Sequence, residues 1–316
     1  MITKDDVVAA RARIAPHVHE TPLLSSTRLG GRAGGGVRLN LKCECMQRTG
    51  SFKARGALNA MLQLSQAERA RGVVTVSAGN HAQALAWASS IVGAECVTVM
   101  PEGASEYKIA ATRGYGGTVE VAPGERKNAF DRAREIASQG KVLVHPFEDD
   151  RVAAGQGTVA LELLEQLPDV KAVIVPIGGG GLIAGMAVAI KTARPDVRVI
   201  GVEPEGAPTM RASLDAGTPQ QIATRTVADG LAAPMVGEMT LDIVRRYVDD
   251  VILLSDEEIV AAMRDILAFA KILVEPAGAA SVAALLAGKV RLDRGAQVAA
   301  VLSGGNVDLD RLKSLL

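Results

Sequence analysis

The chain has 316 residues, enough to bury the core of one large domain or of two modest ones. Its 35 lysines and arginines balance 35 aspartates and glutamates, and aromatic residues make up only 3% of the sequence. This composition gives no net attraction to nucleic acid or to an anionic membrane, and it offers few rings on which bases could stack.

The N-terminus, the apolar runs, the cysteines and the histidines show no sign of secretion, a membrane span, disulfides or zinc. Residues 1–13 are charged and amphipathic, without the apolar run of a secretory signal, and no run of about 18 apolar residues predicts a membrane span. Three cysteines, Cys43, Cys45 and Cys96, cannot build a disulfide framework. Four histidines that form no cluster do not indicate a zinc site. We therefore expect a cytoplasmic protein of enzyme size.

Short β-rich runs alternate with longer Ala-rich helical segments along the chain. The runs that predict strands are 37–42, 73–76, 96–100, 118–121, 142–144, 172–175, 197–202 and 298–302. Strand–helix alternation with apolar strands predicts open, mostly parallel α/β sheets covered on both faces. The strands fall into two series, which predicts two α/β units with a cleft between them.

Lys53 stands behind an aromatic residue and ahead of a helix-forming run, in the string Ser51-Phe52-Lys53-Ala54-Arg55-Gly56. A buried, desolvated lysine is neutral near pH 7 and can then form an imine or accept a proton. Phe52 could lie against the ring of a cofactor. Taken alone, Lys53 also fits an exposed lysine early in a helix, and Phe52 fits an ordinary core residue.

Two further strings follow predicted strands, where ligands of α/β sheets bind. In Ser77-Ala78-Gly79-Asn80-His81, helix N-terminal N–H groups and the side chains of Ser77 and Asn80 could hold a carboxylate and a ring oxygen. Ordinary N-capping by these residues is the alternative. Ser303-Gly304-Gly305-Asn306 is a glycine turn after the last predicted strand.

Four consecutive glycines, Gly178, Gly179, Gly180 and Gly181, follow the strand 172–175 and open a helical run at Leu182. Such a turn at a helix N-terminus is a ready anion site, although a plain tight turn is the alternative. The string lacks the Lys-Ser or Lys-Thr of a Walker loop and the G-x-G-x-x-G spacing of a dinucleotide site. A phosphate site together with a reactive lysine points to pyridoxal phosphate (PLP).

Together these strings resemble the fold type II PLP-dependent enzymes, whose fold is tryptophan synthase β-like, in the serine/threonine dehydratase and serine racemase branch. The resemblance covers essentially the whole chain, including Thr21-Pro22-Leu23, Ala154-Gly155-Gln156-Gly157-Thr158 and Glu275-Pro276-Ala277-Gly278. It implies two open α/β domains with the cofactor in the cleft between them, and a homodimer. The large domain would comprise 1–71 and 147–316, and the small, mobile domain that closes over substrate would comprise 72–146.

The resemblance also assigns roles to residues. It makes Lys53 the Schiff-base lysine and catalytic residue, with Phe52 on the pyridine ring. Asn80 would bond the ring hydroxyl, and Ser303 would face the pyridine nitrogen. The remaining cofactor-binding residues would be Gly178, Gly179, Gly180, Gly181, Leu182 and Glu275, and the substrate would lie against Ser77, Ala78, Asn80 and His81.

The chemistry implied is a β-elimination. A serine hydroxyl does not keep the pyridine nitrogen protonated, so the ring is a moderate electron sink, and Lys53 would remove the Cα proton. Related racemases carry a serine at the position of Ala78, which here has no exchangeable proton. The sequence therefore favours dehydration and deamination of L-threonine or L-serine to a 2-oxo acid and ammonia. Serine racemase and a non-catalytic nucleotide- or metabolite-binding module remain alternatives.

Two positions depart from the family pattern. Arg126 stands near where relatives with dicarboxylic substrates carry an arginine, so 3-hydroxyaspartate is an alternative substrate; a solvated helix face is the other reading. A cation site would use Glu203 and the Ala207 carbonyl, but Thr209 replaces the acidic residue expected next. With one carboxylate fewer, a monovalent cation or none fits as well as Mg²⁺.

Overall fold

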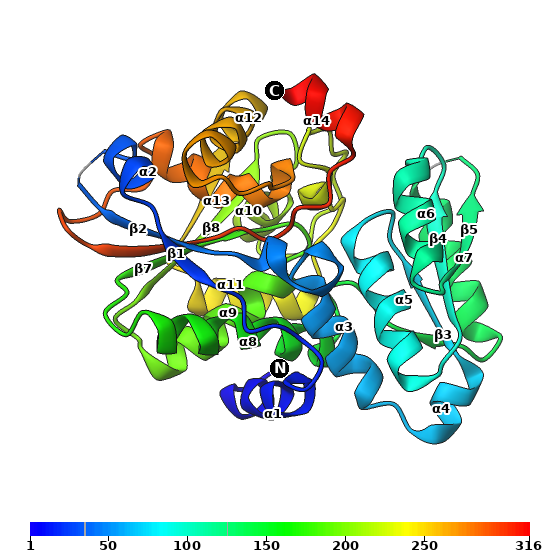
Figure 1. The fold of residues 1–316 in the computed structure, drawn as a ribbon. Coiled ribbons are helices and arrows are strands. Elements are labelled where there is room, and N and C mark those ends of the chain that lie inside the picture. The colour runs from blue at the N-terminus through cyan, green and yellow to red at the C-terminus, as the bar shows by residue number, and fades with distance from the viewer. Residues whose placement is uncertain (35, 125) are drawn as a thin grey trace.

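The larger sheet forms the body of the molecule (Figure 1). In the computed structural model, residues 1–34, 36–124 and 126–316 are described, except for the side chain of Arg126. Within these residues the sheet has the strand order β1-β2-β10-β7-β8-β9, and all neighbours are parallel except β1 and β2. The strands are β1 (Leu23–Ser25), β2 (Arg38–Lys42), β7 (Ala172–Pro176), β8 (Arg198–Pro204), β9 (Asp250–Leu254) and β10 (Gln297–Val301).

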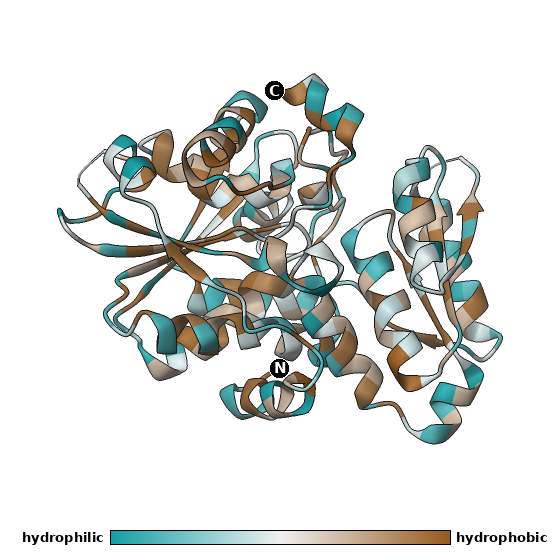
Figure 2. Cartoon of the chain, in the orientation of Figure 1, coloured by the Kyte–Doolittle hydropathy of each residue, from teal (hydrophilic) through white to brown (hydrophobic). Residues whose placement is uncertain are grey.

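Helices cover both faces of this sheet, because its central strands are apolar on both sides. Along β7, Ile174 packs into one core cluster, whereas Val173 and Val175 pack into the other. Figure 2 shows the hydrophobic strands between helices whose outer faces are hydrophilic. The helices that contribute to the first cluster are α2 (Thr27–Arg32), α12 (Asp256–Asp265), α13 (Pro276–Leu286) and α14 (Leu309–Leu315); those of the second are α1 (Lys4–Ile14), α8 (Asp150–Gln166), α9 (Gly181–Ala193), α10 (Thr209–Ala216) and α11 (Glu238–Tyr247).

The smaller sheet is parallel throughout and has the order β5-β4-β3-β6. Its strands are β3 (Val73–Val76), β4 (Cys96–Pro101), β5 (Thr118–Ala122) and β6 (Val142–Leu143). Helices α5 (Asn80–Val92), α6 (Glu106–Gly114) and α7 (Arg126–Ser138) lie between these strands in the chain and pack on the sheet. The unit sits beside the larger sheet (Figure 1).

Helix α3 (Lys53–Leu62) lies at the junction of the two units, packed on α8 of the larger unit and on α5 of the smaller. Small residues allow this close approach: a Cβ at Gly155 of α8 would lie 2.6 Å from the Cα of Gly56. Helix α4 (Gln66–Arg71) then leads to β3. The lysine at the first position of α3 is therefore held where the two sheets meet.

The predicted fold class is confirmed, and each predicted strand is present with its ends shifted by at most two residues. Two strands were missed: β1, which has three residues and pairs antiparallel at the sheet edge, and β9, which precedes a helix in an Ala-rich region. The domain limits 1–71, 72–146 and 147–316 stay a prediction. No helix in the described part of the chain is long and apolar enough to cross a membrane.

Candidate active site

A cavity of about 380 Å³ lies between the two sheets, where four predicted strings come together. The turn after β7 supplies Gly178 to Gly181, and the turn after β3 supplies Ser77 to Asn80. Ser303 follows β10, and Lys53 opens α3. Because the carboxyl ends of parallel strands lie at one edge of a sheet, residues far apart in sequence meet here. Phe52, Ala78, His81, Leu182 and Glu275 also line this cavity.

Lys53 enters the cavity from the N-terminus of α3. Its Nζ donates a hydrogen bond to the Pro146 carbonyl at 2.8 Å and lies 5.2 Å from the centre of the Phe52 ring. Burial lowers the pKa of Lys53 to about 8, because desolvation disfavours the ammonium. A substantial fraction of Lys53 is thus neutral near pH 8, and the neutral amine can attack a carbonyl or accept a proton.

Gly178 to Gly181 form a turn that has no side chains of its own, here called the glycine cradle. Gly180 has φ +92°, a conformation that glycine adopts without strain, and a Cβ at Gly179 would collide with the ring of Phe147. Thr240 Oγ1 donates to the Gly179 carbonyl at 3.0 Å and braces the turn. Helix α9 begins at Gly181, so its first N–H groups and its dipole are directed at the cradle. The site fits a phosphate group.

Asn80 and Glu275 come from different units and meet at the cavity wall. Asn80 Nδ2 donates to Glu275 Oε1 at 2.6 Å. Burial raises the pKa of Glu275 to about 7, and the negative charge of Asp229 adds to the rise, whereas Lys108 and the hydrogen bond from Asn80 oppose it. Ser303 is buried and its Oγ donates to the Ala277 carbonyl at 3.3 Å. These groups and Phe52 line a space suited to a polar aromatic ring.

The described side chains that are predicted to contact the substrate carry no charge. Ser77 Oγ accepts a hydrogen bond from the Gly79 N–H at 3.2 Å. Burial holds the pKa of His81 well below its usual range, so its imidazole is uncharged; its Nε2 lies 3.4 Å from the Val144 carbonyl. Among the described residues, no partner is found for His81 Nδ1. Ala78 presents a methyl group, and the side chain of Arg126 lies outside the described structure.

An ion pair that the sequence did not predict spans the mouth of the cavity. Lys108 of α6 pairs with Asp229, in the 3₁₀ helix η3 (Asp229–Leu231), and both residues line the cavity. In the described structure it is the sole ion pair that joins 72–146 to the remainder of the chain. The partners are 121 positions apart, so no local pattern could reveal them.

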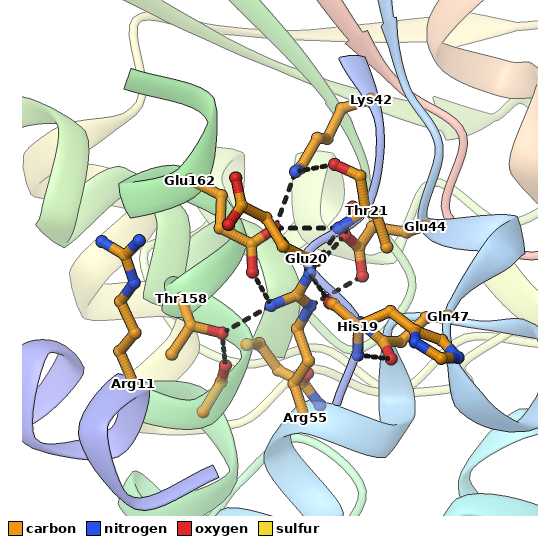
Figure 3. A network of polar contacts seen from close by, with 12 residues as sticks. Arg11, His19, Glu20, Thr21, Lys42, Glu44, Gln47, Arg55, Thr158 and Glu162 are labelled. Atoms are coloured by element: carbon orange, nitrogen blue, oxygen red, sulfur yellow. Dashed lines mark hydrogen bonds and ion pairs between the residues drawn. The ribbon is translucent and has the colours of Figure 1, made fainter. Parts of the chain in front are cut away.

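A buried charged network lies behind Lys53 and was also missed (Figure 3). Arg55, fully buried, donates to both carboxylates of the network: to Glu44 at 2.8 Å and to Glu162 at 2.6 Å. Lys42 Nζ donates to Glu162 at 2.7 Å. Two cations thus balance two anions, and the first turn of α3 is tied to α8 and to the 3₁₀ helix η1 (Glu44–Met46). The signal available was four charged residues in otherwise apolar segments.

The predicted cation ligands lie near one another without forming a cluster of acidic groups. The carboxylate of Glu203 accepts backbone N–H bonds from Met210 at 2.7 Å and from Arg211 at 2.9 Å, and so caps α10. Burial raises the pKa of Glu203 to about 7. Ala207 is buried just before this helix. The described residues contain no group of three or more His, Cys, Asp or Glu side chains placed to hold a metal ion. The cation stays a prediction.

A desolvated lysine and a glycine cradle line one cavity of this α/β fold, an arrangement that fits the class of proteins that bind a phosphorylated carbonyl cofactor. The family model for "Pyridoxal-phosphate dependent enzyme" matches residues 14–304. The chain belongs to this family of PLP-dependent enzymes.

Individual relatives show which PLP-dependent enzymes the chain is similar to. It is 45% identical to an L-threonine ammonia-lyase of Thermotoga maritima, over 100% of this chain and 78% of that protein. It is 43% identical to a serine racemase of Arabidopsis thaliana, over 96% of this chain and 92% of the relative. The solved structure of maize serine racemase superposes with a TM-score of 0.94 at 40% identity, covering 99% of this chain and 96% of the other. The chain is therefore a PLP enzyme related to both threonine dehydratases and serine racemases.

Proposed function

We propose that the protein is an ammonia-lyase that converts L-threonine and L-serine to a 2-oxo acid and ammonia. One observation carries the choice over racemisation: Ala78 stands in the cavity wall next to Ser77, where its methyl group offers no proton. Racemisation requires an acid or base on each face of the planar carbanion, and loss of the Cβ hydroxyl requires a base on one face only. The similarity to a threonine ammonia-lyase over the full chain supports this choice.

PLP, when bound, supplies an electron sink for the carbanion at Cα of the amino acid. We propose that the glycine cradle and the first N–H groups of α9 hold its phosphate, and that Phe52, Asn80, Glu275 and Ser303 surround its ring. The N-terminus of α5 with Ser77 would bind the substrate carboxylate.

Lys53 would act as the base at the substrate. Its Nζ is held at the cavity wall by the Pro146 carbonyl, and its lowered pKa leaves the amine free to accept the Cα proton. As the Cα–H electrons form the Cα–Cβ double bond, the Cβ–OH bond would break, and the departing hydroxide would take up the proton that Lys53 removed and leave as water. The enamine product that is released takes up water and loses ammonia, which gives the 2-oxo acid.

Product analysis tests this proposal directly. The purified enzyme with PLP is supplied with L-threonine, L-serine and 3-hydroxyaspartate, and both 2-oxo acid and D-amino acid are measured. We expect 2-oxo acid from threonine and serine and no D-serine. D-serine formed faster than pyruvate would make the protein a racemase, and turnover restricted to 3-hydroxyaspartate would assign the dicarboxylic substrate instead. A protein that takes up no PLP would overturn the enzyme proposal altogether.

Replacing the Ala78 methyl group, which cannot donate or accept a proton, by a hydroxyl tests this choice more directly. Ala78→Ser should give measurable D-serine from L-serine, detected by chiral chromatography, because the new hydroxyl can return a proton to the carbanion. The matched control is Ala104→Ser, which places a hydroxyl elsewhere on the cavity wall and should produce no D-serine. If the Ala78→Ser enzyme binds PLP, releases pyruvate and still forms no D-serine, the role given to Ala78 is wrong.

We further propose that residues 72–146 form a small domain that closes over the substrate. The Lys108–Asp229 ion pair supports this proposal, because it joins the smaller unit to the larger one at the mouth of the cavity. The expected homodimer and cytoplasmic location remain predictions.

A further inference from the structure

We propose that Asn306 is a positioning residue that fixes which end of the Asn80 side-chain amide faces the cavity. Asn306 is not among the described residues that line the cavity, whereas Asn80 is. The amide of an asparagine has almost the same shape at its oxygen and nitrogen ends, so its partners decide its orientation. The inference rests on the proposed contact between Asn80 and the ring oxygen of PLP.

The orientation starts at a backbone carbonyl. Asn306 Nδ2 donates to the Thr49 carbonyl at 2.7 Å, and a carbonyl can only accept, so the nitrogen end of Asn306 must face it. The same Nδ2 lies 2.8 Å from Asn80 Oδ1, which accepts its second hydrogen. Asn306 therefore forces Asn80 to present its oxygen to the back of the site.

The nitrogen of Asn80 must then point forward. Its Nδ2 donates one hydrogen to Glu275 Oε1 at 2.6 Å, which leaves the second hydrogen for the cavity. A donor at this place stabilises an ionised ring oxygen, whereas a carbonyl oxygen would repel it. The chain Thr49–Asn306–Asn80–Glu275 thus sets the polarity of one wall of the cavity.

Backbone hydrogen bonds near Asn306 hold this chain of hydrogen-bonded residues in position. Phe52 N–H donates to the Ser303 carbonyl at 3.1 Å, and Gly305 N–H donates to the Gly50 carbonyl at 2.9 Å. Thr49 has φ +58°, a left-handed conformation that is strained in a β-branched residue. Gly50 follows with φ +71°, and a Cβ there would collide with Asn306 Oδ1. The conformation of the turn that leads to Lys53 therefore depends on the same contacts that position Asn306.

Two substitutions of Asn306 distinguish loss of its hydrogen bond to Asn80 from reversal of the Asn80 amide. Asn306→Ala removes both donors, and we expect the apoprotein's Kd for PLP to rise about 10-fold, the effect of losing an orienting hydrogen bond at a buried site. Asn306→Asp places an acceptor against Asn80, which should turn its amide and bring Oδ1 to the cavity. The pH at which the absorbance of bound PLP changes should then rise, because the ionised ring oxygen loses its donor.

A double-mutant cycle distinguishes positioning from a general loss of structure. If Asn306 acts through Asn80, Asn306→Ala should change the Kd for PLP less than about 2-fold in an Asn80→Ala background. A 10-fold loss in both backgrounds would overturn the inference. So would an Asn306→Asp protein whose PLP absorbance titrates as in the parent.

Controls make each outcome decisive. Asn40→Asp introduces the same charge at another buried asparagine, which donates to the Val298 carbonyl at 3.3 Å away from the cavity, and it should leave both readouts unchanged. Thermal unfolding of each apoprotein shows that it is folded, and if Asn306→Asp is not, the alanine cycle decides alone. Because no amino-acid substrate is used, failure of the ammonia-lyase assay leaves this result standing.

Discussion

Lys53→Ala should reduce 2-oxo acid formation by at least ~10³-fold, because this substitution removes both the amine that attaches PLP and the base at Cα. Borohydride treatment should fix PLP covalently to the parent protein and not to the variant, as mass spectrometry of the digested proteins would show. The exposed Lys313 provides the control: Lys313→Ala should retain activity and reducible PLP. Covalent PLP in the Lys53→Ala protein would assign the cofactor to another lysine.

The lowered pKa of Lys53 adds a pH signature to the same experiment. The ammonium form cannot attack a carbonyl, and the pKa of Lys53 in the folded protein is about 8. The rate at which apoprotein captures PLP should therefore rise as the pH increases through about 8, and flatten above it. Stopped-flow absorbance measures this rate. A profile that keeps rising toward pH 10, as for an ordinary exposed lysine, would contradict the desolvated environment seen in the cavity.

Arg55→Met should lower the unfolding free energy of the apoprotein by about 3–5 kcal/mol. The substitution leaves Lys42 as the one cation of the network, so the two buried carboxylates of Glu44 and Glu162 are no longer balanced. Arg55 is fully buried and donates to both groups, so water cannot replace it. Urea denaturation followed by circular dichroism gives the value. Arg132→Met is the control, because Arg132 forms its ion pairs with Glu120 and Glu135 at the surface, and its loss should change the unfolding free energy little.

The same network predicts an acid limit to stability. The Arg55 and Lys42 cations, together with their hydrogen bonds, lower the pKa of Glu162 despite the cost of its burial. A carboxyl whose pKa is lower in the folded than in the unfolded protein stabilises the fold above its unfolded pKa. That contribution is lost as the pH falls through its folded pKa. Glu162→Gln should therefore flatten the decline of stability in acid, and an unchanged acid profile would place the titrating group elsewhere.

Local signals in the sequence were sufficient for the fold and for the centre of the candidate site. Val73–Val76 and Ala172–Val175 are continuous β-branched and apolar runs. Small residues follow the first run directly and the second run after Pro176 and Ile177, so the strands and the turns after them could be predicted together. β9 was missed although its end was marked: Ser255 and Glu258 form a capping box at the start of α12. β1 carries too little pattern in three residues.

Pairings between distant residues could not be predicted in this way. Lys108 and Asp229 each look like ordinary surface charges in their own segments, and only the folded chain brings them to one cavity. Asn306 lies in the predicted glycine turn after the last strand, but its partners Thr49 and Asn80 lie more than 220 positions away. Arg55 stands two residues after Lys53, and the residues around it do not identify Glu44 and Glu162 as its partners.

The two sheets carry different parts of the proposed chemistry, and this has a consequence for how the molecule could diversify. The four glycines and Ser303 follow strands β7 and β10 of the larger sheet. Ser77 and Ala78 lie in the turn after β3 of the smaller sheet, and His81 is in the first turn of α5 directly after it. Under the proposed roles, mutations in this short turn could redirect the choice of amino acid while leaving coenzyme attachment untouched. Asn80 is the exception, because it is hydrogen-bonded to Glu275 and Asn306. Under the proposed roles, a mutation of Asn80 would change both the choice of amino acid and the binding of the coenzyme.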